Sequence, residues 1–107
     1  MAEHSTVITT TDTEDAAAEL ARSIVGARLA ACVQVVGPIR SFYHWQGSVH
    51  DEREWQCWAK TSADRVAALR DHIAAHHSYD VPEIIVLPIV DGSPDYLRWL
   101  TAETRPA

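Results

Sequence analysis

The chain has few basic residues. Nine lysines and arginines stand against fifteen aspartates and glutamates, which gives a formal net charge of −6 at pH 7. A nucleic-acid-binding surface needs clustered lysine and arginine to neutralise phosphates, and here these residues are scattered along the chain. An anionic membrane surface requires the same clustering. The composition therefore predicts that neither a nucleic acid nor a membrane is a partner.

Long apolar runs are also missing. No stretch approaches the roughly 18 residues of a membrane-spanning helix. The first ten residues, MAEHSTVITT, lack the basic segment and apolar stretch of a signal peptide. We therefore expect a soluble cytoplasmic protein.

Cysteine is scarce, with only Cys32 and Cys57 in 107 residues. A reducing compartment keeps such residues as thiols, and buried cysteines pack as small apolar side chains. A hairpin centred near Gly47 would place Cys57 opposite position 38, about 20 Å along the strand from Cys32. That separation predicts no disulfide between them.

Linkers, repeats and low-complexity segments are absent as well. The chain is 47% hydrophobic and 22% charged, a composition typical of a globular protein. A chain of this length fits one domain, which we predict to span residues 1–107.

The patterning predicts four strands and three helices. β-Branched residues indicate a strand over 5–11, and an apolar stripe at helical spacing indicates a helix within 12–30. Two long strands then surround a turn near Gly47, and the Gly37-Pro38 pair should bend the first of them. A second helix is expected to start at Ser62, a strand to cover 83–90, and a last helix to open at Ser93.

The apolar residues at helical spacing, and the residues expected at the helix ends, define the first two helices. Thr13 should cap the first helix. The apolar stripe of the first helix consists of Ala17, Leu20, Ile24 and Ala27, and that of the second helix consists of Val66, Leu69 and Ile73. Arg22 and Arg28 are the basic residues expected in the last turns of the first helix. The resulting order is the ferredoxin-like βαββαβ pattern of an α+β fold, with an antiparallel sheet and an extra C-terminal helix.

Alternation in the second hairpin strand predicts an unusual sheet face. Cys57 and Ala59 should point to one side, while Trp58 and Lys60 point to the other. The two helices of this fold cover one face only, so Trp58 would lie on the open face. Leaving an indole in water is unfavourable, by roughly 25 cal/mol per Å² of apolar surface. We therefore predict that another copy covers this face, the alternative being a bent sheet that buries Trp58 within one chain.

Motifs of common enzymes are missing. G-x-S-x-G, the P-loop, H-E-x-x-H and C-x-x-C do not occur. An acylphosphatase-like site would need a basic loop after the first strand, and that loop reads TTTDTED. We therefore expect a protein that is not an enzyme. A ligand site at a subunit cleft is a further hypothesis, formed by Tyr43, Lys60, His77 and Glu83.

Adjacent histidines stand where the second helix should end. His76 and His77 are candidate ligands for copper or another divalent metal, because imidazole nitrogen suits these ions. Neighbouring helical residues point about 100° apart, so one ion could take both only if the helix frays there. The alternative is structural, since a histidine in a last turn interacts favourably with the negative helix end. A weaker cluster of possible ligands lies in the hairpin, at His44, His50, Asp51 and Glu52.

The chain resembles the CutA family of divalent-cation-tolerance proteins from about Val7 to Trp99. The matching stretches are LAACVQVVGPIRSFYHWQGSV, WAKT and YDVPEIIVLPIVDGSPDYLRWL, in the family's order and with its gaps. The resemblance implies a ferredoxin-like subunit, a tight homotrimer and a role in tolerance of copper and other divalent cations.

The resemblance also implies a metal site. In some bacterial relatives two histidines at the end of the second helix and a cysteine at the end of the first strand ligate copper. His76 and His77 match the histidines, but Thr9 stands at the cysteine position and is a poor copper ligand. Ser78 replaces the family's usual proline, and Cys32 and Glu83 are more distant ligand candidates.

Two other roles remain open. One is a signalling trimer that binds a small molecule, resembling the nitrogen-regulatory proteins that share this subunit fold. Those proteins use a long loop and basic residues around a nucleotide, whereas this chain has a short loop and no basic cluster. The other is a structural trimer that presents surfaces to partner proteins.

Overall fold

A computed structural model describes residues 2–106. In chain order the elements are β1 (His4–Thr11), α1 (Glu14–Gly26), β2 (Cys32–Trp45), β3 (Ser48–Ser62), a 3₁₀ turn (Ala63–Arg65), α2 (Val66–His76), β4 (Ile84–Ile89) and α3 (Pro94–Glu103). The four strands form one antiparallel sheet in the order β2-β3-β1-β4. This confirms the α+β, ferredoxin-like prediction with its additional C-terminal helix.

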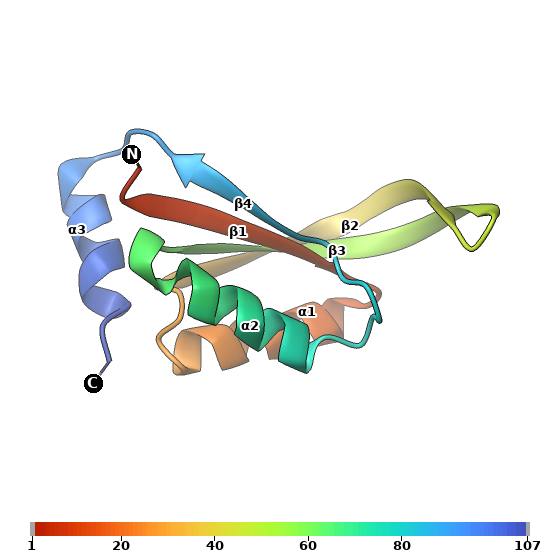
Figure 1. The fold of residues 1–107 in the computed structure, drawn as a ribbon, viewed down its shortest axis with the longest axis horizontal. Helices are drawn as coiled ribbons and strands as arrows, with labels where there is room; N and C mark the ends of the chain where they lie inside the picture. Colours follow the sequence, from red (N-terminus) through yellow and green to blue (C-terminus); the bar gives the residue numbers. More distant parts are fainter. Residues whose placement is uncertain (1, 107) are drawn as a thin grey trace.

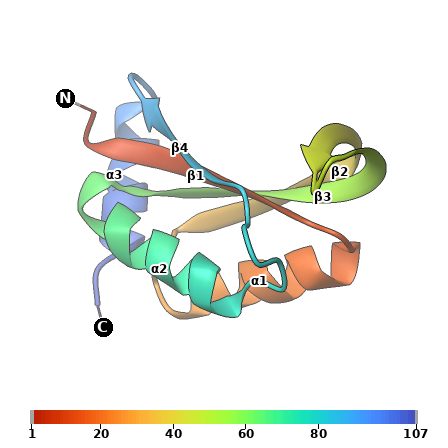
Figure 2. The same ribbon diagram turned by 45° about the vertical axis from the view of Figure 1, so that its right-hand side comes forward.

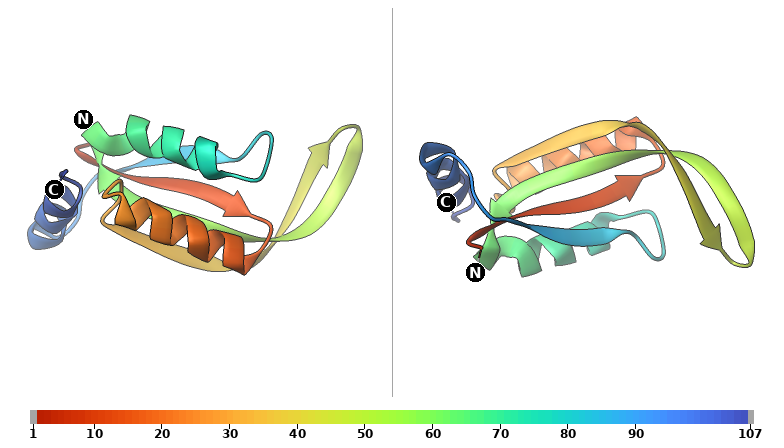
Figure 3. Two further views of the ribbon diagram at one scale, coloured as in Figure 1. Left: turned by 90° about the horizontal axis from the view of Figure 1, so that it is seen from below. Right: turned by 90° about the horizontal axis from the view of Figure 1, so that it is seen from above.

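Helices α1 and α2 cover the same face of the sheet (Figures 1 and 3). They lie side by side (Figure 2), and the Ser23 hydroxyl and the His72 Nε2 atom, 2.7 Å apart, join them. The third helix, α3, sits at one end of the sheet, while the β2–β3 hairpin extends beyond the other end. No helix of residues 2–106 has the length and apolar character needed to cross a membrane.

Helix α1 begins as predicted and ends earlier. The Thr13 hydroxyl accepts a hydrogen bond from the Ala16 amide at 3.0 Å, which satisfies one of the free N–H groups of the first turn. The helix stops at Gly26, so the predictions that Ala27 belongs to the buried stripe and Arg28 to the last turn are wrong. Arg28 has a φ of 59°, and this left-handed residue turns the chain so that Leu29 enters the core.

The second helix starts with a 3₁₀ turn whose N-cap is Ser62, so its α-helical part, α2, begins later than predicted, at Val66. The Ser62 hydroxyl lies 2.9 Å from the Thr104 hydroxyl and makes no cap hydrogen bond. A contact with the C-terminal segment therefore takes the place of a local cap hydrogen bond. The apolar stripe is confirmed, because Leu69 and Ile73 are buried and Val66 packs against them.

The long hairpin contains the predicted bend. Pairing jumps from Val36–Gln56 to Ile39–Glu54, which leaves the Gly37-Pro38 pair as a bulge. Cys57 lies opposite Val35 and not opposite position 38 as predicted, and the bulge accounts for one residue of this difference.

The two cysteines are free and lie on opposite faces of the sheet. Cys32 pairs with Lys60, whose side chain is on the open face, whereas Cys57 is in the core beneath the helices. The absence of a disulfide between them is therefore confirmed, although their separation along the strand is shorter than predicted.

Trp58 lies on the uncovered face, as the alternation predicts. Its neighbour on β1 is Ile8, and the next residue across, on β4, is Ile85. Leu87 is on the same face two residues further along. Ile85 and Leu87 are 45% and 43% exposed, and Trp58 is half-buried. These residues form an apolar strip in the isolated chain. Figure 3 (right) shows that no helix covers this face of the sheet.

Cys57 should resist alkylation in the folded protein. Burial raises the pKa of its thiol to about 11, and the Sγ atom donates to the Ala17 carbonyl at 3.4 Å. Because only the thiolate reacts, iodoacetamide at pH 8 is expected to leave native Cys32→Ser protein unlabelled. The same variant in guanidinium should gain one label by intact-mass spectrometry. Labelling of native protein at the unfolded rate would contradict this.

Candidate functional site

His77 links the end of α2 to the sheet. It follows the last residue of α2 with extended backbone and is half-buried. Its Nδ1 accepts a hydrogen bond from the Tyr79 amide at 3.0 Å, so the proton lies on Nε2, which donates to the Thr10 carbonyl at 2.7 Å. Both ring nitrogens are therefore engaged. His77 thus joins the loop to β1 and does not contact the helix end, and a metal could bind it only after one of these hydrogen bonds breaks.

His76 is placed differently. It is the last residue of α2 and is exposed. Its Nδ1 lies 2.8 Å from the His72 carbonyl oxygen, and it can donate to this acceptor. Nε2 has no such partner among the described residues, so its lone pair is available to a cation.

His72 is the residue that sequence reasoning missed. Its ring stacks on that of His76 with centroids 4.0 Å apart. Burial, and then the neighbouring His76, lower the pKa of His72, which favours the uncharged form. The signal was present in the spacing, because residues four apart lie on the same face of a helix.

The other predicted ligands do not join the histidines. Thr9 is fully buried, and its hydroxyl has no hydrogen-bond partner among residues 2–106. Within the same range no group of three or more His, Cys, Asp or Glu side chains is placed to hold one metal ion, so neither Cys32 nor Glu83 completes a site. In the hairpin, both carboxylate oxygens of Asp51 accept from Arg40, at 2.9 and 2.8 Å.

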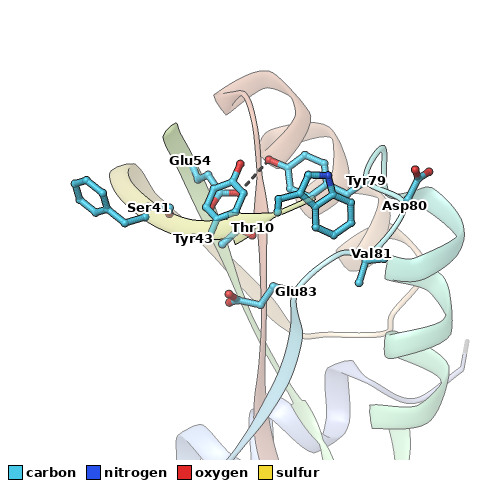
Figure 4. Close-up of a pocket in the computed structure, with 10 residues that line it drawn as sticks. Thr10, Ser41, Tyr43, Glu54, Tyr79, Asp80, Val81 and Glu83 are labelled. Atoms are coloured by element: carbon cyan, nitrogen blue, oxygen red, sulfur yellow. Dashed lines mark hydrogen bonds between the residues drawn. The ribbon is translucent and has the colours of Figure 1, made fainter. Parts of the chain in front are cut away.

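A cavity of about 520 Å³ opens between the hairpin and the loop that joins α2 to β4 (Figure 4). Its lining residues are Thr10, Ser41, Phe42, Tyr43, Trp45, Glu54, Tyr79, Asp80, Val81 and Glu83. Of the residues predicted to converge at a cleft, Tyr43 and Glu83 line this cavity, while Lys60 and His77 do not. The Lys60 ammonium instead donates to Gln34 at 2.7 Å.

The cavity has a strongly negative environment. The Tyr79 hydroxyl donates to Glu54 Oε2 at 3.0 Å (Figure 4). Burial raises the pKa of Tyr79, and Glu54 raises it further. The pKa of Tyr43 is also raised, by burial and then by Glu52 and Glu54. Both phenols therefore stay protonated at neutral pH and beyond.

Comparison with known proteins gives one consistent family. The family model described as "CutA1 divalent ion tolerance protein" matches residues 5–103. Protein CutA, chloroplastic, from Arabidopsis thaliana is 44% identical over 92% of this chain and 54% of its own length. Divalent-cation tolerance protein CutA from Yersinia pestis is 42% identical over 90% of this chain and 81% of its own length. The chain thus spans about half the length of the plant relatives that it matches.

Solved structures agree with this result. CutA1 from Oryza sativa has a TM-score of 0.93 at 40% identity, with 99% of this chain and 97% of that chain covered. The divalent cation tolerance protein from Thermus thermophilus has a TM-score of 0.91 at 38% identity, over 95% and 99% of the two chains. Sequence and structure together place this chain in the CutA1 divalent ion tolerance protein family.

Proposed function

We propose that this protein is a homotrimeric, non-catalytic divalent-cation-tolerance protein that binds copper or a related divalent metal ion. The names of its relatives support a role linked to divalent cations. The observation that carries the metal proposal is the exposed His76 imidazole stacked on His72 at the end of α2. Imidazole nitrogen is a ligand that both copper and zinc accept.

The fit to a metal is partial. His76 offers a free nitrogen, whereas the His72 Nε2 atom is 2.7 Å from the Ser23 hydroxyl and must exchange that partner. His77, the other predicted ligand, must first release Thr10 or Tyr79. Two imidazoles per chain make an open site, which water or a second chain would complete. We therefore expect binding weaker than that of a closed structural metal site.

The proposed trimer rests on the open sheet face. Ile85, Leu87 and Trp58 form an apolar strip that the helices of the same chain do not cover. Contact with other copies would remove this strip from water, and at roughly 25 cal/mol per Å² that burial stabilises an assembly. The apolar strip thus supports assembly, and the number of three copies comes from the family resemblance.

Removing His76 should weaken copper binding. In a calorimetric titration with CuCl₂, we expect His76→Ala to lower affinity at least tenfold, because the available ring nitrogen is lost. The double variant His76→Ala/His77→Ala should lose at least as much copper affinity. The loss should be larger if His77 also binds the ion. His50→Ala, which removes a hairpin histidine, is the matched control and should bind as the unmodified protein does.

Native mass spectrometry with and without copper reports subunit number and bound ions together. Unchanged copper affinity in both His76 variants would remove the proposed metal site. The single variant keeps the test clean, because His76 is exposed and its loss leaves the His77 hydrogen bonds to the sheet in place.

A further inference from the structure

Four separate segments build the cavity at the base of the hairpin, and one of them is β1, which contributes Thr10. Tyr43 and Trp45 come from β2, Glu54 comes from β3, and Tyr79 comes from the loop between α2 and β4. The Tyr79–Glu54 hydrogen bond joins the loop to the hairpin and holds two of these walls together. The cavity is therefore supported by tertiary contacts and does not depend on a single mobile loop.

The charges of its lining all have one sign. Glu54, Asp80 and Glu83 contribute carboxylates, and none of the ten described lining residues is lysine, arginine or histidine. Figure 4 shows the carboxylate of Asp80 pointing away from that of Glu54. Glu54 and Glu83 are therefore the two acids that matter most for an occupant.

Glu54 is the most informative of these acids. It is only 8% exposed, and Tyr79 is the sole hydrogen-bond donor to its carboxylate within residues 2–106. No lysine or arginine in that range forms an ion pair with it. A buried carboxylate without a cationic partner is energetically unfavourable, and a bound cation would relieve this cost.

The cavity does not suit a bare metal ion. Its carboxylates do not form a group of three ligands around one point, among the residues described here. Its volume of about 520 Å³ is that of a small-molecule site. Its walls include the rings of Tyr43, Trp45 and Tyr79, whose faces attract cations, and aromatic cages of this kind bind alkylammonium groups.

We propose that this cavity binds a small organic ammonium cation. Glu54 and Glu83 supply the opposite charge, and the rings of Tyr43, Trp45 and Tyr79 contact the alkylammonium group. This inference goes beyond the divalent-metal proposal and does not depend on it, because the histidines at the end of α2 lie outside this cavity.

Two cations and one neutral isostere test the ligand class. Choline and 1,4-diaminobutane are titrated into the intact protein, with binding followed by calorimetry and by tryptophan fluorescence. We expect at least one of them to bind. For choline, the uncharged isostere 3,3-dimethylbutan-1-ol should bind at least tenfold more weakly. Failure of both cations to bind, or equal binding of the isostere, overturns the proposal.

Variants then locate the site. Glu54→Gln keeps an oxygen that accepts from Tyr79, so the wall should survive while the charge is lost. We expect this variant, and the exposed Glu83→Gln, each to lower cation affinity at least fivefold. Trp45→Leu should reduce it as well. Asp71→Asn removes an exposed acid on α2 outside the cavity and is the matched control.

Two measurements distinguish the ammonium site from a general charge effect and from the metal site. An equal loss in Asp71→Asn would indicate a general effect of negative charge and would overturn the site. Copper affinity should be unchanged in Glu54→Gln, so failure of the metal proposal and failure of the ammonium proposal are distinguishable. Circular dichroism and sedimentation of each variant confirm that the fold and assembly are intact.

Discussion

Replacing Ile85 and Leu87 together by lysine is expected to convert an assembled protein into single chains of 11.9 kDa. Both residues are on β4, point to the open face and are nearly half exposed in the isolated chain. In the proposed trimer they would lie against another copy. Two ammonium groups buried there without partners cost several kcal/mol each, which opposes assembly. Sedimentation velocity and native mass spectrometry measure the outcome directly.

The fold of the single chain should survive this double substitution. Neither residue belongs to the core between sheet and helices, and lysine is accepted on an edge strand. The control is Ala67→Lys/Ala74→Lys, which adds the same charge on exposed positions of α2 and should leave the assembly unchanged. An unmodified protein that already sediments as a single chain, or a lysine variant that stays assembled, would contradict the proposed interface.

The elements were predictable where a local pattern and the tertiary structure agree. The cap at Thr13 and the buried Leu69 and Ile73 follow from side-chain type and helical spacing. The position of Trp58 on the open face follows from strand alternation alone. In each case the neighbours along the chain are sufficient, because the period of the element decides which way a side chain points.

The errors occur where a distant segment changes the local outcome. From the sequence, the second helix is expected to start at Ser62, but the hydroxyl of this residue contacts Thr104, 42 residues later, and a 3₁₀ turn precedes α2. Arg28 looks like a basic residue of the last turn of α1, but its guanidinium donates to the Glu103 carbonyl, 75 residues later, at 3.2 Å. Contacts between residues so far apart in the sequence cannot be predicted from the neighbouring residues alone.

The candidate sites divide in the same way. Sequence reasoning named His76 and His77 but did not show that Thr10 and Tyr79 occupy both nitrogens of His77. The pairing of Glu54 with Tyr79 spans 25 residues and depends on the fold bringing a loop against the hairpin. Only the complete fold shows that aromatic rings and acids share one cavity there.

The central core should be highly sensitive to loss of volume at Ile73. This residue of α2 is fully buried, in the cluster formed by both helices and the inner face of the sheet. Ile73→Ala removes three carbon atoms and leaves a cavity that a packed interior cannot collapse fully. The expected loss of unfolding free energy is about 2–5 kcal/mol, a large share of the roughly 5–15 kcal/mol typical of a domain.

Urea unfolding, followed by circular dichroism at one fixed protein concentration, measures this loss. The midpoint should fall while the dependence on urea concentration stays the same, because the surface exposed on unfolding hardly changes. Ile73→Val removes one carbon and should cost about 0.5–1.5 kcal/mol, so the two variants form a graded series. Val25→Ala, at a 43% exposed position of α1, should shift stability by less than about 0.5 kcal/mol. Equal effects at Ile73 and Val25 would mean that the space between the helices and the sheet is not closely packed, since only a close-packed interior distinguishes a buried methyl group from an exposed one.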